Sequence, residues 1–343
     1  MNIQIINPID YPNWDNLLLT NDQTTFFHTA AWAAVLSEAY HYTPLYFTVI
    51  DNHKLSALIP VMEINSFLTG KRGVSLPFTD HCQPIAANNE DARKLFEKVT
   101  DYGKKAGWKS MEFRGGENLF PTQPSFSIFF THTLNLTNGV KQIAKSFRNS
   151  TWRNIKKAEK NDVTVIRSNS LPSVREFYRL NCMTRKVHGL PPQPWYFFKH
   201  LFKSVISPEK GTIFLSSYKN NAVAGAAFFH FGNQAIYKYG ASDRSYQHLR
   251  PNNLAMWQAI KWFAEKGFSS FSFGRTEPEN LGLMQFKRGW GTNEQILNYY
   301  KYDLAKDRCV EDPNKIMTSY NLFKMMPLPI LKATGRLLYR HVG

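Results

Sequence analysis

A strongly basic segment in the middle of the chain could bind phosphates. Between residues 141 and 160 it carries seven Lys and Arg side chains and a single acid, Glu159. Arg153, Lys156 and Lys160 are spaced to share one face of a helix, and Arg148 precedes them. Such a face attracts phosphates by charge and by the release of counterions. A solvated helix face without a ligand is the alternative interpretation.

A second candidate is the loop at residues 240–253, which follows an expected strand containing Tyr239 and leads into an expected helix. The first backbone N–H groups of a helix lack intrahelical partners and favour anions. Arg250 and Asn252 stand at this turn. The alternative is an ordinary polar loop in which Asn252 or Asn253 caps the helix.

A third candidate is the segment 273–291, read as a strand, a turn, a short helix and a glycine turn. Arg275, Glu277 and Lys287 are its chemically useful residues, because polar groups at the carboxyl end of a strand often face a site in α/β folds. Phe286 and Trp290, four residues apart, are expected in the core. We favour a functional role for Lys287 and Arg275.

Several common reaction classes have no motif in this chain. It contains neither a CxxC pair nor HExxH, so we assign no metal site. The GxSxG, Walker and GxGxxG patterns are also missing. The adjacent pair Asp80 and His81 is not read as a catalytic dyad, because neighbouring side chains in a strand point apart.

The elements that position these residues read as an α/β arrangement present twice. Strand pairs at 44–50 with 55–63 and at 212–218 with 222–231 surround Asn-containing turns. Each pair is followed by a helix and a strand, and the helix after residue 88 is expected to be capped by Asn89. The helix–strand passages 106–117 and 266–277 align without a gap, which indicates duplication.

Four regions follow from this organisation. We expect a first α/β unit at 1–137, a helical insertion at 138–207, a second unit at 208–303 and a basic helical tail at 304–343. The insertion contains Pro191, Pro192 and Pro194, which should separate two of its helices. The tail should form two short helices divided by Pro327 and Pro329.

Composition bounds the partners and the compartment. The 343 residues carry 42 Lys and Arg against 26 Asp and Glu, a formal charge of +16, which favours an anionic partner. Three distant cysteines argue against a disulfide framework. The start of the chain has no secretory signal, and no apolar run approaches the roughly 20 residues of a membrane span. We therefore expect a cytoplasmic protein.

Together these motifs resemble the FemAB family, aminoacyltransferases that build peptidoglycan interpeptide bridges, and its relatives linked to exopolysaccharide synthesis. The resemblance spans about residues 26–303. It is carried by FFHTAAWAAVLSEAYHYTPLYF (26–47), SLPFTDHCQPI (75–85), SFRNSTWRNIKKAEK (146–160), FYRLNCMTRKVHG (177–189), YKYGASDRSYQHLRPNNLAMWQAI (237–260) and FSFGRTEPENLGLMQFKRGWG (271–291).

The resemblance implies an α/β (α+β) fold of two tandem GNAT-like domains with mixed, mainly antiparallel sheets. It also implies transfer of an activated acyl or aminoacyl group to an amine of a cell-envelope or exopolysaccharide precursor. The expected donor is aminoacyl-tRNA or acyl-CoA, with no permanently bound cofactor. The expected acceptor is a phosphorylated or lipid-linked amino sugar or peptide, and the basic tail suggests peripheral contact with the inner face of the membrane.

Aminolysis requires a neutral amine, donors for the developing oxyanion and anchors for both substrates. We assign the oxyanion role to backbone N–H groups near Tyr239, with help from Lys287. Asp243 or Glu277 would receive the amine proton, and Arg275 completes the catalytic set. The donor or acceptor phosphates would be bound by Arg148, Arg153, Lys156, Arg250 and Asn252.

Two other functions stay open at this point. One is an acyl-CoA-dependent GNAT acetyltransferase that acts on an amino sugar. The other is a non-catalytic RNA-binding module that uses the basic helix and exposed aromatic rings.

Overall fold

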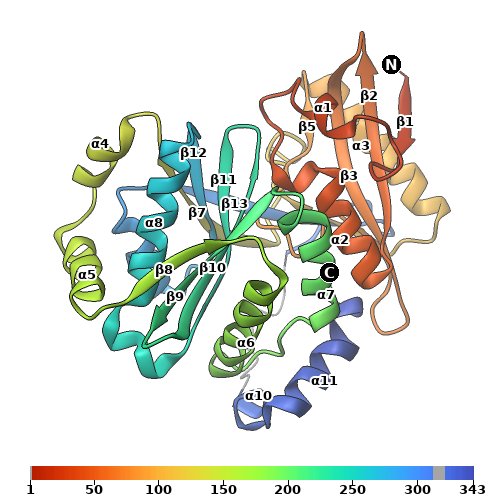
Figure 1. Ribbon diagram of the computed structural model, residues 1–343. Helices are drawn as coiled ribbons and strands as arrows, with labels where there is room; N and C mark the ends of the chain where they lie inside the picture. Colours follow the sequence, from red (N-terminus) through yellow and green to blue (C-terminus); the bar gives the residue numbers. More distant parts are fainter. Residues whose placement is uncertain (1, 312–320) are drawn as a thin grey trace. The chain divides into compact units, whose positions relative to one another are not determined.

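The computed structural model describes residues 2–311 and 321–343, apart from the side chains of residues 321 and 322. The chain divides into two compact units, each built from helices and a sheet (Figure 1). Unit 1 comprises Met1–Phe130, Ile296–Ile316 and Leu338–Gly343. Unit 2 comprises Thr131–Gln295 and Met317–Leu337.

The main sheet of unit 1 is antiparallel except for one parallel pair, β4 with β6. Its strands, in spatial order, are β1 (Ile3–Ile6), β2 (Thr43–Asp51), β3 (Lys54–Ser66), β4 (Gly70–Val74), β6 (Ser110–Arg114) and β13 (Asn293–Asp303). Two short strands join it, β5 (Ile85–Ala86) beside β3 and β14 (Arg308–Cys309) beside β13. The helices of this unit are α1 (Trp14–Leu18), η1 (Phe26–His28), α2 (Ala30–Tyr40), α3 (Asn89–Lys105) and η4 (Tyr339–His341).

The sheet of unit 2 has a similar plan, with β11 parallel to β12 and with antiparallel pairs from β8 to β11. Its strands, in spatial order, are β8 (Thr164–Ser168), β9 (Gly211–Tyr218), β10 (Asn221–Phe231), β11 (Gln234–Ser242), β12 (Ser270–Thr276) and β7 (Ser127–Asn135). Its helices are α4 (Gly139–Lys145), α5 (Asn149–Lys160), α6 (Leu171–Val187), α7 (Trp195–Leu201), η2 (Phe202–Ile206), η3 (Arg244–Leu249), α8 (Pro251–Glu265), α9 (Leu281–Arg288), α10 (Asn321–Met325) and α11 (Leu328–Leu338).

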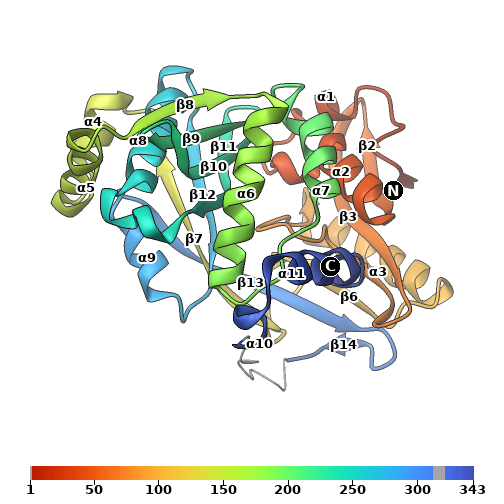
Figure 2. The same cartoon turned by 60° about the horizontal axis from the view of Figure 1, so that its bottom comes forward.

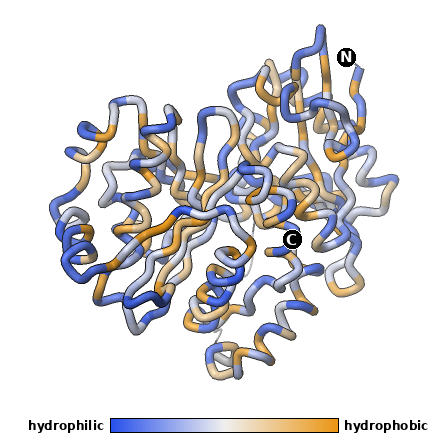
Figure 3. The backbone as a smooth tube through the Cα atoms, viewed as in Figure 1, coloured by the Kyte–Doolittle hydropathy of each residue, from blue (hydrophilic) through white to orange (hydrophobic). Residues whose placement is uncertain are grey.

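Helices cover both faces of the sheet in unit 2. Phe214 and Phe228 point to the face where α8 supplies Ile260 and Phe263 to a buried cluster. On the other face Gly225 lies against the ring of Phe177 on α6, and Figure 2 shows α6 crossing the strands there. Because strand side chains alternate between faces, a sheet covered on both sides has apolar residues at successive positions. Figure 3 shows this hydrophobic colouring along β9 and β10.

The matching strand orders confirm the duplicated α/β scaffold and the expected fold class. Both predicted hairpins form, and both turn through two residues with positive φ: Asn52 and His53 in unit 1, Lys219 and Asn220 in unit 2. Two left-handed residues match the twist of the flanking strands in a two-residue hairpin loop. The helix and the last strand of each copy also form, as α3 with β6 and α8 with β12.

Several local expectations differ from the structure. Asn88, rather than Asn89, caps α3, because its side chain accepts from the Asp91 N–H. The stretch 138–207 is not purely helical: it includes β8, which pairs with β9 in unit 2. The prolines do separate α6 from α7. In the tail, Pro329 lies inside α11, and residues 313–320 are outside the described part of the chain.

All three cysteines are buried and free. In the described part of the chain, every helix is too short or too polar to cross a bilayer.

Candidate active site

The sheet of unit 2 opens between β11 and β12. These parallel strands pair only over Gln234–Ile236 and Ser270–Ser272. Both strands, which are fully described, then run on to Ser242 and Thr276 without pairing with each other. On its other side β11 stays paired with β10 as far as Ser242. Strand N–H groups point alternately to the two edges, and beyond Ile236 the backbone groups on this edge of β11 do not pair with β12.

Helix α6 holds the end of this open edge. The Thr184 hydroxyl accepts from the Ser242 N–H at 2.8 Å and donates to the Ser242 carbonyl at 3.1 Å. Thr184 lies in the last turn of α6. A side chain therefore fixes β11 at the point where a neighbouring strand no longer does so.

We expect Thr184→Val to loosen this end of β11. Valine keeps the shape but leaves the Ser242 N–H and carbonyl without their partner, which should lower the free energy of unfolding of unit 2 by about 2 kcal/mol. Urea denaturation measures the change. Thr137→Val serves as control, because Thr137 is exposed and its hydroxyl donates to Asn135, two residues away. Equal losses in the two variants would contradict the role of Thr184.

The loop after β11 uses Asp243 as a local cap. The Asp243 carboxylate accepts from the Ser245 N–H at 3.0 Å and from the Ser245 hydroxyl at 2.6 Å, at the start of η3. Arg250 is exposed at the N-cap of α8 with φ 62°, and Asn252 is half-buried in the first turn. The suggested Asn cap is wrong, because α8 already begins at Pro251, whose ring supplies a helical φ and lacks an N–H.

Lys287, on α9, holds the end of β12 by hydrogen bonds to its backbone. Its side chain is 2% exposed, and its ammonium donates to the carbonyls of Gly274 at 2.9 Å and Arg275 at 3.0 Å. Gly274 has φ 67°, a conformation that favours glycine. The structure thus brings two predicted residues, Lys287 and Arg275, together through a backbone carbonyl. Next along the strand, the buried Thr276 hydroxyl makes no hydrogen bond within the described residues.

A charged network that the sequence analysis did not identify lies beside Lys287. His132 on β7 is buried, and its Nε2 lies 2.8 Å from Glu294, which also receives two 2.6 Å hydrogen bonds from Arg288. Burial lowers the pKa of His132, the Lys287 charge lowers it further, and Glu294 opposes both. The Arg288 hydrogen bonds hold the pKa of Glu294 below its usual value. The sequence signal for it was that His132 lies two residues from both Phe130 and Leu134, on the same face of β7.

The basic segment forms α5 as predicted, with its cations in solvent. Arg148, Arg153 and Lys156 are exposed. On the inner side, Ile155 is fully buried and the Trp152 ring packs 5.3 Å from that of Trp257 on α8. Among the described residues, no acid pairs with these three cations, so their charge is available to a ligand.

The other predicted residues are placed apart from one another. The Tyr239 ring packs against Phe198 and Phe229 at 6.2 Å, on the face covered by α6 and α7. Glu277 is exposed just beyond β12. Gly240, the residue after Tyr239, leaves room for the Tyr237 hydroxyl, which a Cβ would displace. Within the described residues, no hydrogen bond or ion pair joins Arg153, Arg250 and Lys287.

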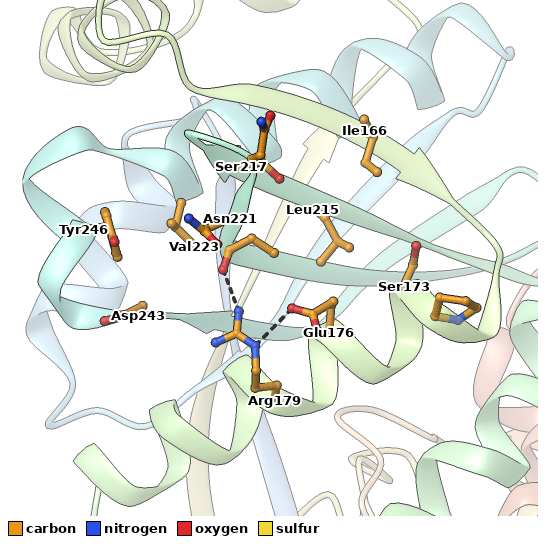
Figure 4. Close-up of a pocket in the computed structure, with 13 residues that line it drawn as sticks. Ile166, Ser173, Glu176, Arg179, Leu215, Ser217, Asn221, Val223, Asp243 and Tyr246 are labelled. Atoms are coloured by element: carbon orange, nitrogen blue, oxygen red, sulfur yellow. Dashed lines mark hydrogen bonds and ion pairs between the residues drawn. The ribbon is translucent and has the colours of Figure 1, made fainter.

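A groove of about 710 Å³ lies on the α6 face of unit 2 (Figure 4). Leu215 and Val223 contribute apolar side chains, and Asp243 stands at one end. On α6, Arg179 donates to Glu176 at 3.0 Å and to the Ala222 carbonyl at 2.7 Å. The groove therefore combines apolar and charged side chains next to the end of β11. Among the described residues, no group of His, Cys, Asp and Glu is arranged to hold a metal ion.

Unit 1 has its own buried cation at the equivalent strand end, which the sequence analysis also missed. Arg114 ends β6 and is 9% exposed; its Nη1 donates to the Thr79 carbonyl at 3.4 Å, and its guanidinium lies 5.1 Å from the Tyr299 ring centre. Its Nε has no hydrogen-bond partner within the described residues. The repeat alignment, which places Arg114 opposite Gly274, was the available signal.

Comparison with known proteins places these features in context. Residues 145–288 match the model of the acetyltransferase (GNAT) domain family. A lipid II:glycine glycyltransferase of Staphylococcus epidermidis is 36% identical over 76 residues, 20% of this chain and 18% of that protein. The counterpart in Staphylococcus haemolyticus is 32% identical over 97 residues, 26% of this chain and 23% of that protein. The chain thus spans about a fifth of the length of these curated relatives.

The fold is shared over most of the chain. The crystal structure of FemX matches with a TM-score of 0.69 at 13% identity, over 87% of this chain and 97% of FemX. A tandem GNAT protein from the clavulanic acid biosynthesis pathway matches with a TM-score of 0.54 at 6% identity, over 88% of this chain and 99% of that protein. These likenesses confirm the tandem GNAT-like architecture.

Proposed function

We propose that the chain is a FemAB-like member of the GNAT-fold proteins and acts as an N-acyl/aminoacyltransferase. It transfers an activated acyl or aminoacyl group to an amine of a cell-envelope or exopolysaccharide precursor. The observation that carries the proposal is the opening between β11 and β12. An extended acyl group fits such an opening by lying along the edge of β11 that β12 does not pair, which places its carbonyl against fixed backbone donors.

The reaction at this edge is a direct aminolysis. The acceptor amine attacks the donor carbonyl, a C–N bond forms, and the C–O bond of an ester or the C–S bond of a thioester breaks. Backbone N–H groups of β11 near Tyr239 and Ala241 stabilise the oxyanion of the intermediate. Because Lys287 is held by two carbonyls of β12, its role is to position this strand end rather than to contact the oxyanion.

The amine must lose a proton during the transfer. The Asp243 carboxylate already accepts two hydrogen bonds from Ser245, so it is engaged as the cap of η3. Glu277 is exposed just beyond the end of β12, one of the two strands that line the opening. We therefore assign proton acceptance to Glu277, while Arg275 supplies positive charge next to it. The groove beside Asp243 is suited to the acceptor, since it offers apolar and charged side chains together.

The donor is held by cations on the outside of unit 2. Arg148, Arg153 and Lys156 line α5, and Arg250 with Asn252 stands at the start of α8. These groups match a donor that carries phosphates, as aminoacyl-tRNA and acyl-CoA both do. The corresponding acceptor is a phosphorylated or lipid-linked amino sugar or peptide, such as the lipid II in the names of the relatives.

The decisive experiment is mass spectrometry of products from a panel of donors and acceptors. The purified chain is incubated with aminoacyl-tRNAs or acyl-CoAs and with amino-sugar and lipid II acceptors. A mass gain of one acyl or aminoacyl group on an acceptor amine supports the proposal. Acetylation of a free amino sugar by acetyl-CoA alone would favour a simple acetyltransferase. Salt-dependent RNA binding without any product across the panel would contradict transfer.

We expect the double substitution Arg153→Gln with Lys156→Gln to weaken donor binding while leaving the chemical step intact. Loss of two phosphate contacts should raise the KM for the donor about tenfold and reduce the slope of log affinity against log salt by about 2. The control is Lys98→Gln with Lys105→Gln, which removes the same charge from exposed positions on α3. A similar rise in KM in both variants would show that only net charge matters.

A further inference from the structure

The C-terminal helix α11 has two faces of different character. Its inner face is packed: Leu331 is fully buried, Gly335 faces the Pro192 carbonyl with no room for a side chain, and the Lys332 ammonium lies 5.4 Å from the Tyr178 ring centre. These contacts attach α11 to unit 2. The helix is therefore a fixed part of the folded protein rather than a loose tail.

The outer face of α11 exposes apolar side chains to solvent. Ile330 is 53% exposed and Leu337 is 66% exposed, and Ala333 between them is also exposed. Their spacing of three and four residues places them in one stripe along the helix. Just before this helix, Met325 at the end of α10 is 84% exposed. Figure 3 shows that hydrophobic and hydrophilic residues alternate along this segment.

Cations flank this stripe. Arg336 is exposed next to Leu337, and Lys324 is exposed next to Met325. Arg336 and Lys324 have no acidic partner among the described residues. A surface that alternates apolar side chains with free cations matches a bilayer with anionic headgroups, which offers acyl chains at one depth and negative charge just above it.

A turn in unit 1 repeats the pattern next to the last residues of the chain. Phe67 and Leu68, in the turn between β3 and β4, are 79% and 57% exposed. The Arg340 guanidinium lies 6.0 Å from the Phe67 ring centre. Unit 1 thus carries a separate set of exposed apolar side chains with a cation of its own.

We propose that the outer face of α11, defined by Ile330, Ala333, Arg336 and Leu337, docks on an anionic lipid bilayer. Ile330 and Leu337 insert at the level of the headgroups, and Arg336 pairs with lipid phosphates. The inner face stays packed on unit 2, so docking needs no unfolding. This inference does not depend on the transferase activity, and its test has no catalytic readout.

The test is flotation of the full chain with vesicles of phosphatidylcholine alone or of phosphatidylcholine mixed with phosphatidylglycerol. We expect binding to the anionic vesicles, weakened by salt because exposed charges are screened. Arg336→Gln should lower the vesicle affinity about fivefold, the usual effect of one basic residue near such a surface. Ile330→Ser with Leu337→Ser should lower it at least as much.

Matched controls distinguish docking through α11 from nonspecific binding of the protein surface to vesicles. Leu19→Ser with Ile9→Ser removes exposed apolar side chains from unit 1, and Lys98→Gln removes a charge from α3. These variants should bind like the wild type, and circular dichroism should show that all variants are folded. Absence of wild-type binding, equal binding to neutral vesicles, or unchanged binding of both α11 variants would each overturn the proposal.

Discussion

Lys287→Met should lower the rate of product formation about 10²-fold while leaving the chain folded. Methionine fills nearly the same space but removes the ammonium that holds the carbonyls of Gly274 and Arg275. The end of β12 then loses two charge-assisted hydrogen bonds, and the β12 side of the opening becomes mobile. A displacement of about 1 Å between reacting groups is enough for a rate loss of this size. Steady-state kinetics with the donor and acceptor that the wild type uses measure the loss.

A neighbouring residue provides the control for Lys287. Arg288 lies next to it on the same helix, but its side chain is 42% exposed and bonds to Glu294. Arg288→Gln removes the same charge and should change the rate only a few fold. Because Lys287 acts by positioning, its loss should appear mainly in kcat with little change in the KM for the donor. Lys287→Arg should recover part of the rate, since it keeps the cation. A kcat of Lys287→Met within threefold of the wild type would disprove the positioning role.

The parts of the fold that the sequence predicts are those encoded locally. Both hairpins depend on two-residue turns with Asn at a left-handed position, and α3 and α8 depend on helical periodicity. The strands β7 and β8 were not assigned, because their pairing partners β12 and β9 are far away in the chain. Edge and crossover strands carry weaker patterns, since only part of their surface is buried.

In the candidate site, too, the features encoded locally could be predicted and those that depend on distant parts of the chain could not. The basic face of α5 follows from spacing alone, and Lys287 and Arg275 lie close to each other as their short separation allows. The sequence does not show that the Lys287 ammonium donates its hydrogen bonds to backbone carbonyls of β12. Nor does it show that Asp243 caps η3. The same holds for the bond between Thr184 and Ser242, which are 58 residues apart. Each depends on the relative placement of side chain and backbone, which only the folded chain fixes.

Unit 1 should lose stability in mild acid because of one buried histidine. His28 is fully buried, its Nδ1 accepts from the Thr25 N–H at 3.0 Å, and its Nε2–H therefore donates to the Gln83 carbonyl at 3.1 Å. The neutral ring is fully satisfied, and protonation would remove the acceptor. Burial accordingly lowers the pKa of His28 to about 4, against about 6.5 in the unfolded chain. The unfolded state then binds more protons, so stability is present above about pH 6.5 and decreases as the pH falls toward 4.

Between pH 7 and pH 5 this single group should remove roughly 2 kcal/mol from the free energy of unfolding, since one pKa unit corresponds to about 1.4 kcal/mol. Urea denaturation at both pH values, with hydrogen exchange of amides in η1 and α2 as a local readout for unit 1, measures the effect. His28→Gln will be less stable at pH 7, yet it should lose about 2 kcal/mol less on acidification than the wild type. His248→Gln, at an exposed position, should lose as much unfolding free energy between pH 7 and pH 5 as the wild type. An unchanged pH dependence in His28→Gln would show that other groups control the acid sensitivity.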